Sequence, residues 1–266
     1  MSTKQFFKAH TVFRYEAFKT FMQQQGINNE NSIRQALKYY HQTGAITHIR
    51  RLLYAIANEG WIDPYLVAVC ATQRAVLGYH TALEFHGLAY TTFNELIYLT
   101  ETPGHGFTFK HQIFRPICHP KTLLEQNKAF VGVDSVKRDK ATIRVTSVER
   151  TIVDVLDRPD LAGGWEEVIR SLDYVVRFDA QKIIDYVLLL NKASTVAKVG
   201  YFLEQRPQYL AVDEKYLVQL LPHIPKQPYH MDPKQKGRGK LISKWGLIVP
   251  DSISQRTWEE PYNDAI

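Results

Sequence analysis

Four polar residues between positions 31 and 38 recur at the spacing of one face of an α-helix. Asn31, Arg34, Gln35 and Lys38 are three or four residues apart, and no acidic residue follows Glu30 in this stretch. Arg can donate two hydrogen bonds to guanine, Asn and Gln can pair with adenine, and Lys can neutralise a phosphate. The alternative is an ordinary solvated face, which would more often include carboxylates. The pattern therefore favours a helix that reads base edges in the major groove of DNA.

A second cluster of basic residues follows shortly afterwards. Arg50 and Arg51 lie between two short segments, 46–49 and 52–56, that are expected to be strands, and His48 precedes them. Arg at the tip of such a hairpin is suited to contacts with phosphate or with the minor groove, although a solvated turn is the alternative. The expected DNA-binding residues are Asn31, Ser32, Arg34, Gln35, Lys38, His48, Arg50 and Arg51.

The positive charge of the chain is concentrated near its N-terminus. Residues 1–60 contain eight basic and three acidic side chains, a net charge of +5, whereas the remaining 206 residues contain 25 basic and 24 acidic ones, a net charge of +1. A local positive field attracts a polyanion, because Lys and Arg neutralise phosphates. Charge alone is also compatible with a solvated surface. Together with the helix pattern, it indicates double-stranded DNA as a partner.

Three helices and a hairpin must position these side chains. Helices are expected over 3–9 and 15–24, and Gly26 is typical of a helix end. Asn29 can cap a third helix that runs to about Tyr40. Helix, short turn, helix and basic hairpin is the order of a winged helix-turn-helix. Residues 58–64 combine Gly, Pro and polar residues, so we place a domain boundary there and predict a DNA-binding domain over 1–60.

The larger remainder, 61–266, is expected to be a separate effector domain. It is predicted to be mixed α/β over 61–146, mainly helical over 147–222 and an extended tail over 223–266, which makes the whole chain α+β. Its expected helices are 65–85, 147–156, 165–176, 180–190, 194–204 and 214–221, and its expected strands are 94–100, 108–117 and 142–146.

No pattern in the sequence indicates an enzyme. Phosphate-binding loops, a Gly-x-Ser-x-Gly motif and a His-Glu-x-x-His motif are absent, and we expect no catalytic residues, no metal and no cofactor. Asp160 after Pro159, with Asp213, Glu214 and Lys215 far downstream, would suit a metal-dependent nuclease, but the spacing is long. Five histidines also lie close together in the sequence without the spacing of metal ligands: His80, His86, His105, His111 and His119.

Other features of the sequence concern further contacts and the location of the protein. Residues 234–244 form a basic stretch that is either a second phosphate contact or a solvated loop. Cys70 and Cys118 fit no metal-ligand spacing and are expected to be free thiols. No apolar run approaches the roughly 18 residues of a membrane span, and residues 1–10 have no apolar signal core. These observations lead us to expect a cytoplasmic protein with no membrane partner.

Two blocks of the second region resemble the AbiEi-like antitoxins of type IV toxin-antitoxin (abortive infection) systems. The first runs from Gly78 to Leu88 and contains Ala82-Leu83-Glu84-Phe85-His86-Gly87-Leu88, and the second runs from Thr146 to Glu166 and contains Ser147-Val148-Glu149-Arg150-Thr151. The resemblance extends over most of residues 10–205. The sequence departs from the family after Arg50 and Arg51, where Leu52 stands in place of the usual Gly.

The resemblance implies two roles. The N-terminal domain would repress transcription of the chain's own operon, and the rest would counteract a nucleotidyltransferase toxin without forming a stable complex with it. Two other functions remain open on the sequence: a DNA-binding adaptor subunit of a phage-defence assembly, and the metal-dependent nuclease.

The same blocks also have structural interpretations. Thr146 and Glu149 have the spacing of a capping box, and Gly87 fits a helix end. Arg150 and Asp154 are four residues apart, as in a surface ion pair.

Overall fold

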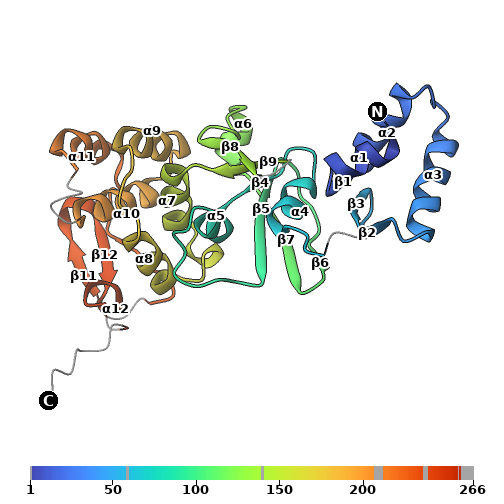
Figure 1. Ribbon diagram of the computed structural model, residues 1–266. Coiled ribbons are helices and arrows are strands. Elements are labelled where there is room, and N and C mark those ends of the chain that lie inside the picture. The colour runs from blue at the N-terminus through green and yellow to red at the C-terminus, as the bar shows by residue number, and fades with distance from the viewer. Residues whose placement is uncertain are drawn as a thin grey trace, which may run out of the picture. The chain divides into compact units, whose positions relative to one another are not determined.

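The protein is a mixed α+β chain, as the sequence predicts (Figure 1). The computed structural model describes residues 2–57, 60–138, 141–206, 212–235, 239–256 and 258. The chain divides into two compact units, and each is built from separate segments. Unit 1 comprises residues 1–77, 93–119 and 134–145, and unit 2 comprises residues 78–92, 120–133 and 146–266. The expected boundary at 58–64 therefore differs from the observed division, because 61–77 belong to unit 1; Asn58 and Glu59 lie outside the described residues.

The N-terminal part of unit 1 contains three helices and a small antiparallel sheet. Asn29 caps the third helix as expected, since its side chain accepts hydrogen bonds from the backbone N–H groups of Asn31 and Ser32. Gly26 ends the second helix with a φ of +82°, a conformation that glycine adopts freely. The elements are α1 (Thr3–Ala9), β1 (Val12–Arg14), α2 (Tyr15–Gln24), α3 (Glu30–Gln42), β2 (Ile46–Arg50) and β3 (Leu53–Ile56).

This segment has a hydrophobic core of its own. The core is mainly aromatic, and every residue of it lies between positions 6 and 46: Phe6, Phe13, Tyr15, Phe18, Phe21, Met22, Ile33, Leu37 and Ile46. The strand order is β1-β3-β2, so β1 adds a third strand to the expected hairpin. The three helices and the hairpin are confirmed, whereas β1 was not predicted.

A six-stranded mixed sheet completes unit 1. Its order is β6-β7-β5-β4-β9-β8, with β5 parallel to β7 and β4 parallel to β9. The expected helix over 65–85 is wrong: the chain forms a short helix, a strand and a second helix there. The expected strand over 108–117 is a hairpin of two strands. The elements are α4 (Pro64–Cys70), β4 (Val76–Leu77), β5 (Glu95–Thr100), β6 (Phe107–Phe109), β7 (Gln112–Cys118), β8 (Val133–Arg138) and β9 (Ala141–Thr146).

Unit 2 is built around a helical core. Its helices are α5 (Tyr79–Phe85), α6 (Lys121–Glu125), α7 (Val148–Asp157), α8 (Trp165–Asp173), α9 (Ala180–Leu190), α10 (Ala193–Glu204), α11 (Glu214–Leu220) and α12 (Asp251–Ser254), with short 3₁₀ turns at Pro159–Leu161, Leu221–His223 and Ser243–Trp245. Figure 1 shows α7, α9 and α10 next to one another. None of the described helices is long and apolar enough to cross a membrane.

The described part of the segment 223–266 is not an extended tail. Its described residues form the sheet β10 (Tyr229–His230), β12 (Leu247–Pro250) and β11 (Gly239–Ile242), in that order. Trp245, Leu247 and Val249 are fully buried in the core that the helices form. The apolar residues of this segment therefore close the core of unit 2, which explains why they are ordered as strands.

Arg150 forms a buried network within unit 2, not the expected surface ion pair. Its Nε lies 3.2 Å from Asp154 Oδ2, and both side chains are almost completely buried. Its Nη1 donates to the carbonyl oxygens of Ala129 and Val131 at 2.8 and 2.7 Å. Tyr186 donates to the second oxygen of Asp154 at 2.7 Å. These hydrogen bonds satisfy charges whose burial would otherwise be costly.

The expected capping box is also different in detail. Ser147, and not Thr146, caps α7, since its hydroxyl accepts from Arg150 N–H. Thr146 bonds instead to Thr151. His86 at the end of α5 donates through Nε2 to the Thr146 carbonyl at 2.7 Å, which links the two blocks that resemble the antitoxin family. Gly87 has a φ of +70°, as expected of a residue that ends a helix.

We predict that Gly200→Ala destabilises the chain. A Cβ at Gly200 would lie 2.2 Å from the Trp245 ring, so the fully buried indole must move. The cost of about 1–3 kcal/mol for overpacking should exceed the gain in helix propensity, which is at most about 1 kcal/mol. Chemical denaturation measures the change in the free energy of unfolding. Gly60→Ala is the control, because its Cβ would meet no atom within 4 Å; equal stabilities of the two variants would contradict the packing of Trp245.

Candidate nucleic-acid interface

The helix α3 presents its polar face to solvent because its apolar face is buried. Ile33 and Leu37 are 0% and 4% exposed within the aromatic core, and Ala36 and Tyr40 pack against it. This fixes the rotation of the helix about its axis. The five predicted side chains on α3 are all exposed: Asn31, Ser32, Arg34, Gln35 and Lys38.

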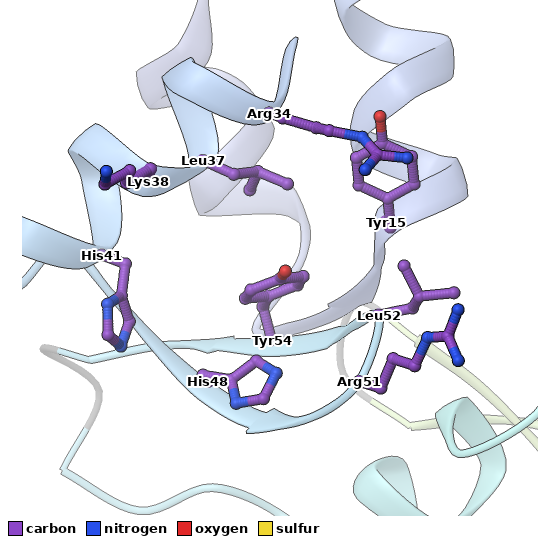
Figure 2. A pocket seen from close by; sticks show the side chains of 9 residues that line it. All are labelled: Tyr15, Arg34, Leu37, Lys38, His41, His48, Arg51, Leu52 and Tyr54. Carbon is purple, nitrogen blue, oxygen red and sulfur yellow. The ribbon is translucent and has the colours of Figure 1, made fainter. Parts of the chain in front are cut away.

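A groove of about 670 Å³ lies between α3 and the hairpin formed by β2 and β3. Figure 2 shows the side chains of α3 along one side and those of the hairpin along the other, with the Tyr54 ring between them. The lining residues are Tyr15 from α2, Arg34, Leu37, Lys38 and His41 from α3, His48 from β2, Arg51 and Leu52 from the turn, and Tyr54 from β3. The structure thus brings together Arg34, Lys38, His48 and Arg51 from the predicted set. Asn31, Ser32 and Gln35 are not part of the lining.

All permanently charged side chains among the described lining residues of this groove are positive. Arg34, Lys38 and Arg51 carry permanent positive charges, two histidines add hydrogen-bond donors, and no carboxylate is among the lining residues. Cations from two structural elements around one open groove create a local positive potential. Such an arrangement is suited to bind an anionic chain.

Glu30, at the start of α3, holds Arg34 in place. Its Oε1 lies 3.3 Å from Arg34 Nη2, and its Oε2 lies 2.8 Å from Lys19 Nζ. The Tyr15 hydroxyl donates to the same carboxylate at 2.7 Å. The hydrogen bonds from Lys19 and Tyr15, with a further contribution from Arg34, lower the pKa of Glu30 from 4.5 to about 2.

Arg50 does not project freely from the hairpin. Its guanidinium lies 4.8 Å from the centre of the Phe107 ring, and its Nη1 donates to the His105 carbonyl at 3.3 Å. These contacts within unit 1 cover one face of the guanidinium and engage one of its N–H groups. Arg51, in contrast, is exposed and lines the groove. The two adjacent arginines, which the sequence grouped together, therefore have different environments.

Leu52 adopts a left-handed backbone conformation of the kind that glycine adopts most freely. Its φ is +62°, and its carbonyl accepts a hydrogen bond from Tyr15 N–H at 2.9 Å. A non-glycine residue in this region costs roughly 1–2 kcal/mol. The Leu52 side chain packs against the aromatic core, and this contact offsets part of the strain. The turn consequently retains a glycine-like geometry with Arg51 beside the groove.

Sequence reasoning missed three polar side chains that line this groove: Tyr15, His41 and Tyr54. His41 continues the polar face of α3, three residues after Lys38, so helical periodicity could have identified it. Tyr15 and Tyr54 reach the groove from α2 and β3, and no local pattern indicates that. The contact of Lys19 with Glu30 is likewise a tertiary contact between α2 and α3.

The alternative sites from the sequence are not assembled in the described residues. These contain no group of three or more His, Cys, Asp or Glu side chains placed to bind a metal ion. His80 lies between Glu84 and Glu167 in the buried core of unit 2, at 3.3 and 3.2 Å. The carboxylates considered for a nuclease pair with cations: Asp160 with Arg158, Asp213 with Lys215 and Glu214 with Lys244.

The basic stretch 234–244 is only partly described. Lys236 and Arg238 lie outside the described residues. Lys244 lies 2.8 Å from Glu204 and 3.2 Å from Glu214, so its charge is compensated within unit 2. Lys240 is exposed on β11. The described residues of this stretch therefore form no cluster of uncompensated cations.

Comparison with known proteins shows the fold alone. No protein-family model matches the chain, and no curated protein matches it. Among solved structures, the chain is similar to the crystal structure of the Rv2827c protein from Mycobacterium tuberculosis, with a TM-score of 0.58 and 13% sequence identity. The match covers 94% of this chain and 90% of that one, so both units are included in the shared fold.

We predict that the Glu30 carboxyl titrates with a pKa of about 2 in the full-length chain. The pKa of Glu30 is lower in the folded state than its unfolded value of 4.5. The stabilisation by contacts of the ionised carboxylate is therefore fully present above about pH 4.5, and it is lost as the pH falls through about 2. NMR titration of the side-chain carboxyl carbon measures this value. Lys19→Met should move the pKa back towards 4.5, whereas Lys4→Met should not; an unperturbed value in the unmutated protein would contradict the Lys19–Glu30–Arg34 contacts.

Proposed function

We propose that the N-terminal part of unit 1 is a winged helix-turn-helix that binds double-stranded DNA. The single observation that carries the proposal is the groove between α3 and the hairpin, whose described lining contains three cations and no carboxylate. The element order α1, β1, α2, α3, β2, β3 supports it, since α2 and α3 are joined by a five-residue turn and are followed by a hairpin. In this proposal α3 enters the major groove.

Two kinds of contact are expected from the exposed residues. Asn31, Arg34 and Gln35 lie in the first half of α3, which in helix-turn-helix proteins contacts base edges. Lys38 and Arg51 lie further along the groove and are placed to contact phosphates, which position a protein on DNA without reading its sequence. Glu30 pairs with Arg34, and in this proposal a base or phosphate replaces Glu30 as its partner.

We propose further that the whole chain is a cytoplasmic transcriptional repressor and antitoxin that counteracts a nucleotidyltransferase toxin. This part rests on the resemblance of residues 78–88 and 146–166 to the AbiEi-like family. In support, the helices of these two blocks, α5 and α7, pack together in the core of unit 2, and the His86–Thr146 hydrogen bond joins the two blocks. The antitoxin role is assigned to unit 2. The toxin is a functional partner, and a stable complex with it is not part of the proposal.

We predict that Lys38→Ala and Arg51→Ala weaken binding of the full-length chain to a duplex from its own promoter. Each should make the negative slope of log affinity against log salt concentration shallower by about 0.9, the contribution of one phosphate contact. Arg50→Ala is the matched control, because its guanidinium is held by Phe107 and His105. Fluorescence anisotropy at several salt concentrations measures the slopes. Identical slopes for the Arg50 and Arg51 variants would rule out the proposed position of the hairpin.

We predict that the full-length variant Arg34→Ala with Gln35→Ala separates the two activities. Losing contacts to base edges should cost roughly 1–3 kcal/mol of discrimination between promoter and random DNA per contact. Promoter repression should therefore fail, while growth on co-expression with the toxin should be as for the unmutated chain. If the variant is folded and protection is lost together with repression, the antitoxin role depends on DNA binding, and the assignment of that role to unit 2 is wrong.

A further inference from the structure

Unit 2 contains a pocket of about 460 Å³ that the proposed DNA-binding site does not use. This volume lies within the usual range of small-molecule sites. The pocket is formed by the end of α7, the starts of α8 and α10, and the segment around β10. Its apolar side chains are Pro159, Trp165, Tyr229, Met231 and Pro233, and its charged ones are Asp157, Asp160, Lys192, Lys198, Asp232 and Lys234.

Lys198 is a buried cation that lines this pocket. The residue is 5% exposed, and its Nζ lies 5.1 Å from the centre of the Trp165 ring. Among the described residues, no hydrogen-bond acceptor or carboxylate pairs with its ammonium group. Burial lowers the pKa of Lys198 to about 8, although nearby aspartates act in the opposite direction. A buried ammonium without an anionic partner is unfavourable, and an anion in the pocket would supply that partner.

Two helix N-termini also border the pocket. Gly164 and Trp165 form the start of α8, and Lys192 and Ser194 flank the start of α10. Neither helix has a side chain that caps its first N–H groups. The first turn of α10 has no acidic residue, whereas that of α8 contains Glu166, which pairs with Arg170, and Glu167, which accepts hydrogen bonds from Thr91. The first N–H groups of a helix lack intrahelical acceptors and carry a partial positive charge, so they bind oxyanions well.

The aspartates of the pocket already have partners. Asp157 lies 2.6 Å from Lys192 and accepts a hydrogen bond from Thr195. Asp160 binds Arg158 through both oxygens at 3.0 and 2.8 Å. Asp232 accepts from Lys234 N–H at 2.9 Å. Lys192 and Arg158 therefore pair with two of the three carboxylates, while the aspartates act on Lys198 only through space and none of the described ones pairs directly with its ammonium group.

We propose that this pocket binds the phosphate group of a phosphorylated small molecule. Lys198 supplies the charge-assisted hydrogen bond, and the starts of α8 and α10, which border the same pocket, supply N–H donors of the kind that bind phosphate at helix N-termini. The pocket is larger than phosphate alone requires. The organic part of the ligand lies against Trp165, Tyr229 and Met231.

The test uses isothermal titration calorimetry on the full-length chain with inorganic phosphate and ribose 5-phosphate as probes. Both should bind, and ribose 5-phosphate should bind more tightly because its sugar contacts the apolar wall. Lys198→Met should weaken both by about tenfold or more, as expected for the loss of a charged hydrogen bond. Lys182→Met is the matched control, since Lys182 is an exposed lysine of α9 in the same unit and does not line the pocket.

A second measurement on the unmutated chain does not depend on the folding of a variant. Lys198 should be acylated by a small anhydride with a rate that rises through a midpoint near pH 8, because the neutral amine is the nucleophile. Bound phosphate should reduce this rate and shift its midpoint upwards, whereas the acylation of Lys182 should not change. Mass spectrometry of the labelled peptides distinguishes the two lysines.

The proposal would be overturned if neither probe binds, or if the Lys198 and Lys182 variants bind the probes equally well. Failure of phosphate to protect Lys198 in the unmutated chain would do the same. Equal affinity for inorganic phosphate and ribose 5-phosphate would overturn the organic part and assign free phosphate as the ligand. None of these outcomes depends on DNA binding.

Discussion

Burial of Ile33 and Leu37 is the constraint on which the proposed interface depends. Each fully buried aliphatic side chain contributes roughly 1.5–3 kcal/mol, far more than any single exposed contact of α3. The aromatic side chains of α1, β1 and α2 form the surface that receives them. Once these two residues are buried, the rotation of α3 is set, and Arg34 and Lys38 must lie on the side of the groove. The arrangement of the polar face thus follows from the packing of the apolar one.

Unit 2 depends in a comparable way on Arg150. Its guanidinium joins the carbonyl oxygens of Ala129 and Val131 to Asp154, so it connects the segment 120–133 to α7. A buried ion pair of this kind adds little net stability over an apolar pair, but it strongly disfavours arrangements that leave either charge unpaired. The network therefore specifies where the segment lies on α7. This accounts physically for the Arg within the second family-like block.

Local patterns predicted the elements that are stabilised locally. Asn29 and Gly26 mark the ends of helices, and the period of α3 correctly separated its buried and exposed faces. The expected helix over 65–85 failed because Val76 and Leu77 pair with β5 and β9, and such long-range pairing leaves no local signal. The same holds for the site. The side chains of Arg50 and Arg51 differ in environment because Arg50 contacts Phe107, which is about 57 positions away in the chain. Tertiary contacts decided each of these cases.

The division of each unit into separate segments has a consequence for synthesis on the ribosome. The aromatic core of residues 6–46 is available as soon as the first sixty residues have emerged, so this part can fold early. The central strand β4 obtains its parallel neighbour β9 only after residue 145 has been made, and the core of unit 2 lacks Trp245 until residue 245 has been made. During that interval the growing chain exposes unpaired strand edges and apolar helix faces. Nascent chains of this protein should therefore need chaperones more in their second half than in their first.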